Sequence, residues 1–441
     1  MSATTLSRES AARQGGVAAM SACAMGQSIA SGATTPSRLL EEHLEIIAQR
    51  EPDVLAWVHL DRDGARARAR ALDAAPPAGP LHGIPFGIKD NIDTHDMPTG
   101  YGSAIHAGHR PARDASCVAS MRLAGANPLG KTVSTEFAHR APGATRNPHA
   151  AAHTPGGSSS GSAAAVACGM VPIAFGSQTT GSVIRPAAYC GVVGYKPTYG
   201  QFNPSGMLAN TPAFDTLGVM TRAVEDIALV RRALLDDSLP ALKPAALAGV
   251  RVAVCRTPWW DQASADAHAV LEQAAAALER AGVVIGDFAD NGAFDALEQA
   301  NLVISGYEFA RTLSHERLFA FDRLSAVLRE GRMADGLRET HAAYVTALRR
   351  LEHARVQLDE AFDAVDFVLT LPAPGAAPAG LASTGSAIFN MPWTSLHTPA
   401  ITLPVARDGR GLPLGVQLVA KRYRDGPLLD FAHTVLARLR D

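Results

Sequence analysis

The chain is poor in lysine and cysteine. Of its 40 basic residues five are lysines, namely Lys89, Lys131, Lys196, Lys243 and Lys421. The five cysteines are odd in number, widely spaced and form no Cys-x-x-Cys pair, so neither a disulfide framework nor a zinc ribbon is indicated. We therefore expect a protein of the reducing cytoplasm.

The chain also lacks a charge excess and a long apolar run. A net charge of −2 gives no reason to expect nucleic acid or an anionic membrane as partner. No apolar run reaches the roughly 20 residues that span a bilayer. The stretch from Gly15 to Ala33 follows Arg8 and Arg13 but lacks the leucine-rich centre of a signal peptide. We expect it to form an amphipathic helix.

What remains is an ordinary globular composition. Hydrophobic residues make up 47% of the 441 residues and charged residues 19%, which allows a large core. No shift in composition marks a linker, so we expect one domain over residues 1–441. Its expected parts are a helical segment 1–75, a core of about 80–225, a variable helical region of about 290–365 and C-terminal strands in 366–441.

Periodicity and turn residues predict strands that alternate with helices, as in α/β proteins. The best-marked helix covers 38–50, where Thr35 or Ser37 can cap and Pro36 suits the first turn. The segment after Lys196-Pro197-Thr198 is expected to be loop up to Thr221. The other predicted helices are 60–75, 115–124, 162–169, 224–235 and 268–281, and the predicted strands are 127–130, 171–175, 250–255, 283–287, 401–404 and 415–420.

Two serines and a lysine carry the chemistry. A glycine-serine loop, Gly156 to Gly161, contains Ser158, and Ser182 follows 24 residues later. Lys89 lies in the apolar segment Gly83 to Asn91, where burial would lower its pKa. A serine hydroxyl needs a base to take its proton before it can act as a nucleophile, and a neutral lysine can be that base. The plainer alternatives are a flexible glycine-serine linker and a surface lysine.

Other serine and metal motifs fit less well. Gly157 to Gly161 matches G-x-S-x-G with Ser159 as nucleophile, but that motif needs a hydrophobic strand before it, and 145–156 is polar and broken by prolines. None of the five lysines has a serine three residues before it, so the S-x-x-K motif is absent. No HExxH motif and no phosphate-binding loop is present either. A linker would not run directly into the apolar, helix-forming Ser162 to Met170. These observations favour a hydrolase without a metal.

Seven segments together resemble the amidase signature family. They are Gly83–Asp93, Gly130–Ala138, Thr145–Pro148, His153–Ala167, Gly181–Thr198, Gly411–Val419 and the acidic Asp425. The resemblance covers nearly the whole chain. It implies a single large α/β domain with a mostly parallel mixed β-sheet covered by helices.

The resemblance also implies a Ser-cisSer-Lys triad. Ser182 would be the nucleophile, Ser158 the serine after a cis peptide bond, and Lys89 the base. Backbone N–H groups of the turn Thr179, Thr180, Gly181 and Ser182 would form the oxyanion hole. No cofactor or metal is needed.

The neighbouring residues leave questions open. The family usually has two glycines before the nucleophile, and here Thr180 replaces the first, so it either narrows the acyl pocket, contacts substrate or is merely tolerated. Arg185 either braces the turn, which we favour, or binds a substrate carboxylate. Gln178 and Ala138 are candidate substrate-binding residues, and Ser159 is a candidate support.

The expected function is hydrolysis of a non-peptide carbon-nitrogen bond in a small, uncharged amide, anilide or carbamate. The alternatives are an amidotransferase A-type subunit, a hydrolase that needs an accessory chain, and a catalytically silent binding protein. Specificity walls are expected in 138–143, 301–332 and 380–393, whose aromatic residues we interpret mostly as core. The expected partner is a small-molecule substrate, and a homodimer is common for soluble enzymes of this size.

Overall fold

The computed structural model describes residues 16–236 and 238–440. They form one α/β domain around an 11-stranded sheet in the order β1-β3-β2-β4-β6-β5-β10-β11-β9-β7-β8. The strands are β1 (Trp57–Leu60), β2 (Pro85–Lys89), β3 (Asn127–Thr132), β4 (Ile173–Gln178), β5 (Val193–Lys196), β6 (Thr216–Thr221), β7 (Arg251–Val254), β8 (Val284–Asp287), β9 (Phe367–Thr370), β10 (Ala400–Arg407) and β11 (Pro413–Val419).

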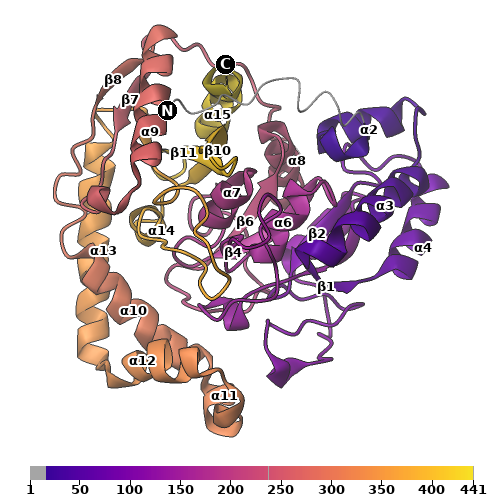
Figure 1. Ribbon diagram of the computed structural model, residues 1–441, viewed down its shortest axis with the longest axis horizontal. Helices are drawn as coiled ribbons and strands as arrows, with labels where there is room; N and C mark the ends of the chain where they lie inside the picture. Colours follow the sequence, from indigo (N-terminus) through magenta and orange to yellow (C-terminus); the bar gives the residue numbers. More distant parts are fainter. Residues whose placement is uncertain (1–15, 237, 441) are drawn as a thin grey trace.

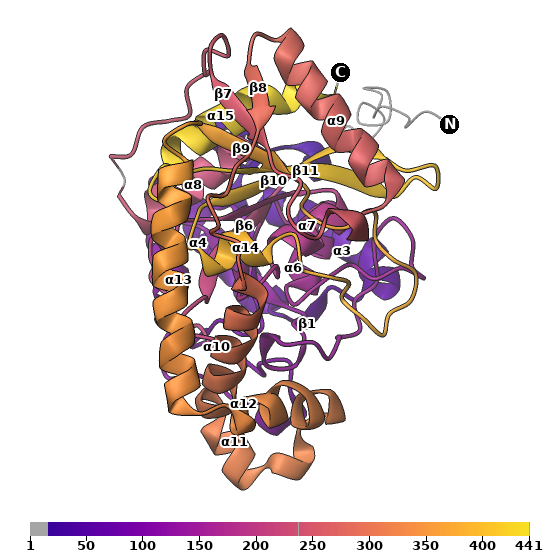
Figure 2. The same cartoon turned by 90° about the vertical axis from the view of Figure 1, so that its left-hand side faces the viewer.

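Helices cover both faces of this sheet, and a further group of helices projects away from it (Figures 1 and 2). They are α2 (Ala22–Ala30), α3 (Pro36–Val54), α4 (Arg62–Asp73), α5 (Ser116–Leu123), α6 (Ser160–Ala167), α7 (Ile184–Cys190), α8 (Val224–Leu234), α9 (Ala265–Arg280), α10 (Leu297–Thr312), α11 (Ser314–Phe319), α12 (Ala334–Arg338), α13 (His341–Ala361), α14 (Met391–Ser395) and α15 (Asp425–Arg440). Among the described residues no helix is long and apolar enough to cross a membrane.

The large mixed sheet covered by helices is confirmed, but it is not mostly parallel. Among the described strands six pairings are antiparallel and four are parallel. The parallel pairings join β3, β2 and β4 in one half and β9, β7 and β8 in the other. The strands between these two groups, including the β10–β11 hairpin, pair antiparallel.

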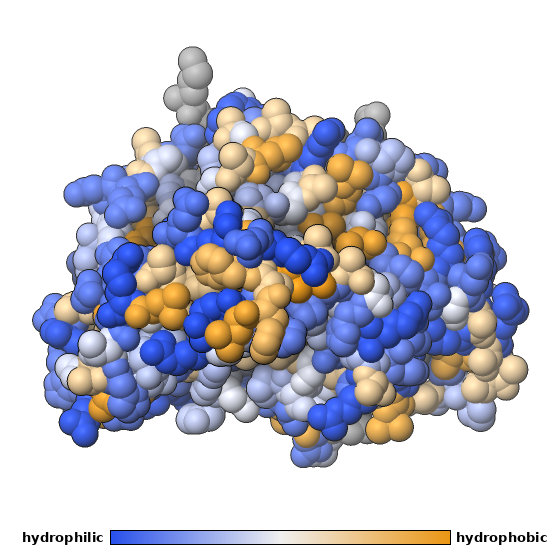
Figure 3. Space-filling model, turned by 90° about the horizontal axis from the view of Figure 1, so that it is seen from below, coloured by the Kyte–Doolittle hydropathy of each residue, from blue (hydrophilic) through white to orange (hydrophobic). Residues whose placement is uncertain are grey.

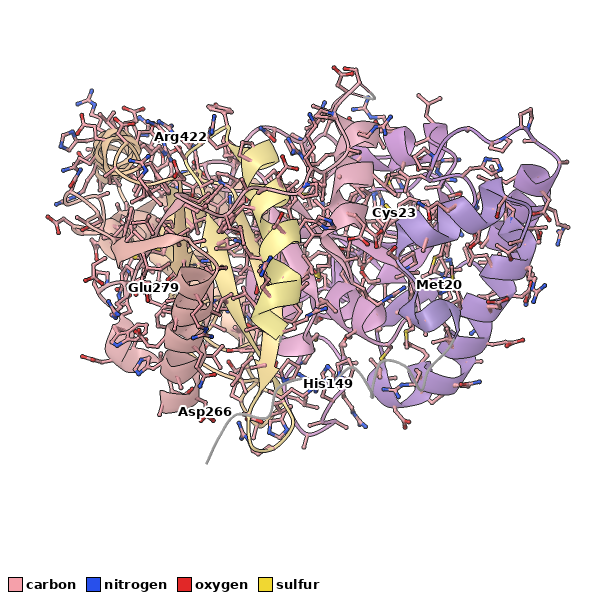
Figure 4. The ribbon with its side chains drawn as sticks, turned by 90° about the horizontal axis from the view of Figure 1, so that it is seen from above. Met20, Cys23, His149, Asp266, Glu279 and Arg422 are labelled. Atoms are coloured by element: carbon pink, nitrogen blue, oxygen red, sulfur yellow. The ribbon has the colours of Figure 1, made fainter. Side chains whose placement is uncertain are left out.

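Two apolar layers form because side chains alternate across the strands. On β4, Ile173 and Phe175 face one hydrophobic cluster, which α2, α5, α8, α9 and α15 cover. Ala174 faces the opposite cluster, which α3, α4, α6 and α7 cover. Figure 4 shows α9 from above, its two ends marked by Asp266 and Glu279, running beside the β10–β11 hairpin.

Most predicted elements are present within a few residues of their expected bounds. Thr35 caps α3, because its side chain accepts a hydrogen bond of 3.3 Å from the Arg38 N–H. One expectation is wrong, because the presumed loop before Thr221 contains β6. The expected C-terminal strands are β9, β10 and β11, which α15 follows, and the helix expected in the N-terminal stretch is the short α2, preceded by η1 (Val17–Ala19). Residue 15 and the preceding Arg8 and Arg13 lie outside the described residues.

The sheet topology brings distant segments together. Because β2 and β4 run parallel and side by side, their carboxyl ends meet at one edge of the sheet. Lys89 is the last residue of β2, and Ser177 and Gln178 end β4. The fold therefore places the lysine beside the turn that carries Ser182.

Candidate active site

Lys89 is a fully buried amine at the carboxyl end of β2. Its side chain is 0% exposed, and every residue of β2 is buried. Burial, opposed by the nearby Asp215 and assisted by Arg185, lowers its pKa to about 7. At neutral pH a substantial fraction of this amine is therefore uncharged.

The partners of the Lys89 amine suit a proton acceptor. Nζ lies 2.6 Å from Ser158 Oγ, 2.8 Å from Ser177 Oγ and 3.4 Å from the Ser177 carbonyl oxygen. A neutral amine has two N–H donors and one lone pair. Because the two oxygens of Ser177 can take the two donors, the lone pair can accept the proton of the Ser158 hydroxyl.

The orientation of Ser177 is fixed from the other side by Asn91. Asn91 Nδ2 donates a hydrogen bond of 2.9 Å to Ser177 Oγ, which also accepts from Lys89 Nζ. Both lone pairs of this hydroxyl are then used. Ser177 and Asn91 were not among the predicted site residues, although Asn91 is the last residue of the segment that marked Lys89.

Ser158 lies in the loop before α6, and the Gly157–Ser158 peptide bond is cis, as the resemblance implies. Arg185 holds this loop: its Nη2 donates to the Gly157 carbonyl at 2.5 Å and its Nη1 to the Gly385 carbonyl at 2.7 Å. The guanidinium is buried and joins two loops that border the site. These contacts agree with the bracing interpretation of Arg185.

Ser182 lies in the turn between β4 and α7 and is 8% exposed. The Ser159 N–H donates to the Ser182 carbonyl at 3.4 Å, which joins the two serine-bearing segments. No hydrogen-bond acceptor is recorded for the N–H groups of Thr180, Gly181 and Ser182 among the described residues. They are the donors expected for an oxyanion hole.

Gln178 supports this turn from behind. Its Oε1 accepts from the N–H groups of Val183 at 2.8 Å and Ile184 at 3.0 Å, and its Nε2 donates to Thr394 Oγ1 at 2.9 Å. Thr394 Oγ1 in turn donates to the Thr180 carbonyl at 2.7 Å. These contacts make Gln178 a support of the turn.

Asp215 braces the other end of the turn. Its carboxylate accepts from Thr179 Oγ1 at 2.6 Å and from the N–H groups of Asn210 and Thr211. Burial raises the pKa of Asp215 to about 7, against the hydrogen bonds that lower it. Sequence reasoning missed this residue because it lies in the segment interpreted as loop, with no motif around it.

A cavity of about 630 Å³ opens over Ser182. Thr179, Thr180, Gly181 and Ala138 line it, and Ser158, Ser159 and Lys89 lie behind its wall. All three expected wall segments contribute. The lining residues from those segments are Ala138, His139, Arg140, Pro142, Asn301, Leu302, Ser305, Val327, Arg332, Ala382, Ser383, Thr384, Gly385, Ser386, Ala387, Ile388 and Met391.

The wall is polar and cationic rather than aromatic. Phe309, Phe389 and Trp393 are at most 1% exposed and belong to the core, as interpreted from the sequence. Glycine is needed at 181, since a Cβ there would lie 2.3 Å from Asn390 Oδ1. The half-buried Thr180 takes the position beside it, so its side chain borders the cavity.

A family model described as Amidase matches residues 38–429. The chain belongs to the amidase family. The A-type subunit of a glutamyl-tRNA(Gln) amidotransferase from Synechococcus sp. (strain RCC307) is 32% identical, over 93% of this chain and 95% of its own. Among amidase structures, one titled "Crystal structure of amidase" has a TM-score of 0.87 at 28% identity, covering 95% of this chain and 100% of its own.

A second amidase structure, the native peptide amidase from Stenotrophomonas maltophilia, has a TM-score of 0.83 at 28% identity. It covers 96% of this chain and 97% of its own. The relatives thus include both amidases and amidotransferase subunits by name. Family membership establishes an amidase-type enzyme, and the site geometry must decide what this member does.

Proposed function

We propose that this amidase hydrolyses a carbon-nitrogen bond through an acyl-enzyme on Ser182. The observation that carries the proposal is the buried Lys89 amine, which lies 2.6 Å from Ser158 Oγ, behind the wall of a cavity that Ser182 lines. The resemblance supplies the order of the relay from Ser182 through Ser158 to Lys89. The bond to be cleaved is that of a small amide, anilide or carbamate.

In the proposed mechanism neutral Lys89 accepts the Ser158 proton while Ser158 accepts that of Ser182. Ser182 Oγ then attacks the carbonyl carbon, and the oxyanion accepts hydrogen bonds from the backbone N–H groups of the turn. Ser158 returns a proton to the leaving nitrogen, which departs as the amine. Water, deprotonated by the same relay, attacks the acyl carbon and releases the acid and the free Ser182 hydroxyl.

Covalent labelling with a fluorophosphonate tests this proposal. We expect one phosphonyl adduct per chain, located on Ser182 by peptide mass spectrometry and absent from Ser182→Ala. Ser160→Ala is the matched control, since that hydroxyl bonds to the Val133 carbonyl and takes no part in the relay. An adduct on Ser159, or no adduct at all, would contradict the proposal.

An amidotransferase A-type role is the second candidate, because relatives of 32% identity carry that name. Such a subunit would release ammonia from glutamine and require partner chains and an acceptor. Glutamine hydrolysis that appears only when partner chains are added would favour this role. Release of amine from small amides by the purified chain alone would favour the hydrolase.

A further inference from the structure

The cavity over Ser182 carries an excess of positive charge. Three arginines line it, namely Arg140, Arg185 and Arg332, and Glu298 is the one acid among its described lining residues. Glu298 is exposed and accepts a hydrogen bond of 3.2 Å from the Trp259 indole. A cleft lined by one sign of charge concentrates ligands of the opposite sign.

The contacts of Arg185 are structural, so this arginine gives no functional reason for the excess of positive charge in the cavity. Two of its nitrogens donate to the Gly157 and Gly385 carbonyls. Neither carbonyl neutralises the charge, and Nε of this buried guanidinium has no hydrogen-bond partner among the described residues. Because the two carbonyls hold Arg185 as a brace between two loops, the candidates for binding a ligand are Arg332 and Arg140.

Arg332 is held in place without a carboxylate of its own. It lies in η6 (Val327–Met333), and its Nη1 donates to Ser305 Oγ on α10. Ser305 Oγ donates onward to the Asn301 carbonyl at 2.5 Å, so it is fixed as an acceptor. No ion pair of Arg332 is recorded among the described residues, and the nearby Asp335 pairs with Arg338.

The surroundings of Arg332 make this charge costly. Burial and the charge of Arg140, opposed by Asp335, lower its pKa to about 10, so the guanidinium stays protonated at neutral pH. Burial and the same two arginines hold the pKa of His139 well below its usual range, so that imidazole is neutral. The half-buried guanidinium of Arg332, which has no counter-ion among the described residues, would be stabilised by an anion that enters with the substrate, and the exposed Arg140 at the same cavity adds to the attraction.

We propose that the substrate carries a carboxylate, which Arg332 binds with help from Arg140 while the scissile carbonyl lies at Ser182. This inference rests on the proposed amidase function. A guanidinium offers two parallel N–H donors to a carboxylate, so the pair fixes orientation as well as charge. The inference replaces the uncharged substrate expected from the sequence, since no phenylalanine, tyrosine or tryptophan is found among the described residues that line the cavity.

Matched 4-nitroanilides test the inference on the wild-type chain. Succinyl and glutaryl anilides carry a terminal carboxylate, and 4-methylpentanoyl and 5-methylhexanoyl anilides replace its two oxygens by methyl groups. We expect kcat/KM to be at least about ten-fold higher for each carboxylate, mainly through KM, and the ratio to fall at high salt. Equal or faster cleavage of the methyl analogues, with Ser182 still labelled by fluorophosphonate, would overturn the inference and leave the amidase proposal standing.

Variants then assign the carboxylate to Arg332. Arg332→Gln should bring the ratio of kcat/KM between carboxylate and methyl anilides close to one. Arg332→Lys should keep part of this ratio, because the charge remains while the two parallel N–H donors of the guanidinium are lost. Arg329→Gln on the same element is the control and should keep the full ratio, since Arg329 pairs with Asp322 outside the cavity. A labelled, folded Arg332→Gln that keeps the wild-type ratio would overturn the assignment. Failure of every anilide and of labelling would instead refute the proposed function.

Discussion

At the scale of the residue, activity depends on one proton on Lys89. The neutral amine is the active form, so protonation below a pKa of about 7 removes the base. For an uncharged anilide we expect kcat/KM to rise about ten-fold per pH unit up to pH 7 and to level off above it. Stopped assays of released nitroaniline from pH 5 to 9 measure this, and a profile that stays flat down to pH 5 would contradict the role of Lys89.

The titration of Asp215 must be distinguished from that of Lys89 in the pH profile. Burial raises the pKa of Asp215 to about 7, the same value to which the pKa of Lys89 is lowered. Asp215→Asn removes the second titrating group and also a charge that favours the lysine ammonium. The acid limb should therefore persist and move to lower pH. Disappearance of the limb in this variant would assign it to the carboxyl group instead.

At the scale of the element, the turn between β4 and α7 depends on a buried amide. Gln178→Leu would leave the Val183 and Ile184 N–H groups without their acceptor, at a cost of about 1–3 kcal/mol for each buried group. We expect lower stability in urea and slower labelling of Ser182. Thr394→Val keeps Gln178 Oε1 and should cost less, and equal losses in the two variants would contradict this account.

The sequence predicts some elements of this enzyme and not others. The serine loop, the lysine segment and α3 with its Thr35 cap follow local rules, because the residues that specify them are neighbours in the chain. The β2 strand gives no such signal. All five of its residues are buried, so its sequence shows no alternation of apolar and polar residues.

The missed site residues share one physical cause. Asp215 and Thr394 reach the turn from 36 and 216 residues away in the chain, so their roles depend on the strand order and not on local pattern. The mostly parallel sheet fails for a similar reason, because alternation of strands and helices does not encode the β10–β11 hairpin and its neighbours. Resemblance supplied Lys89, Ser158 and Ser182, and only the tertiary structure supplied what holds them.

At the scale of the whole molecule, one wall of the cavity belongs to a helical projection. The elements α10, α11 and α12 extend away from the sheet at the lower edge of Figures 1 and 2. Figure 3 shows the molecule from this side, with hydrophobic residues among hydrophilic ones. Large apolar side chains of this region are exposed, including Leu318 at 62% and Phe319 at 78%. The sheet carries Lys89 and Ser182, and the projection carries Arg332, so reaction and recognition can be perturbed separately.

A substitution at Gly336 tests whether recognition by Arg332 can be perturbed without the reaction at Ser182. A Cβ at this position would lie 1.8 Å from the Gly306 carbonyl oxygen, so Gly336→Ala must push α12 away from α10 and displace the adjacent η6. We expect KM for the succinyl anilide to rise about ten-fold or more, because the Arg332–Ser305 contact is lost, while Ser182 is still labelled. Gly426→Ala, with no atom within 4 Å of its added Cβ, is the control. If Gly336→Ala slows labelling as much as it raises KM, the projection and the sheet are one mechanical unit and the division proposed here is wrong.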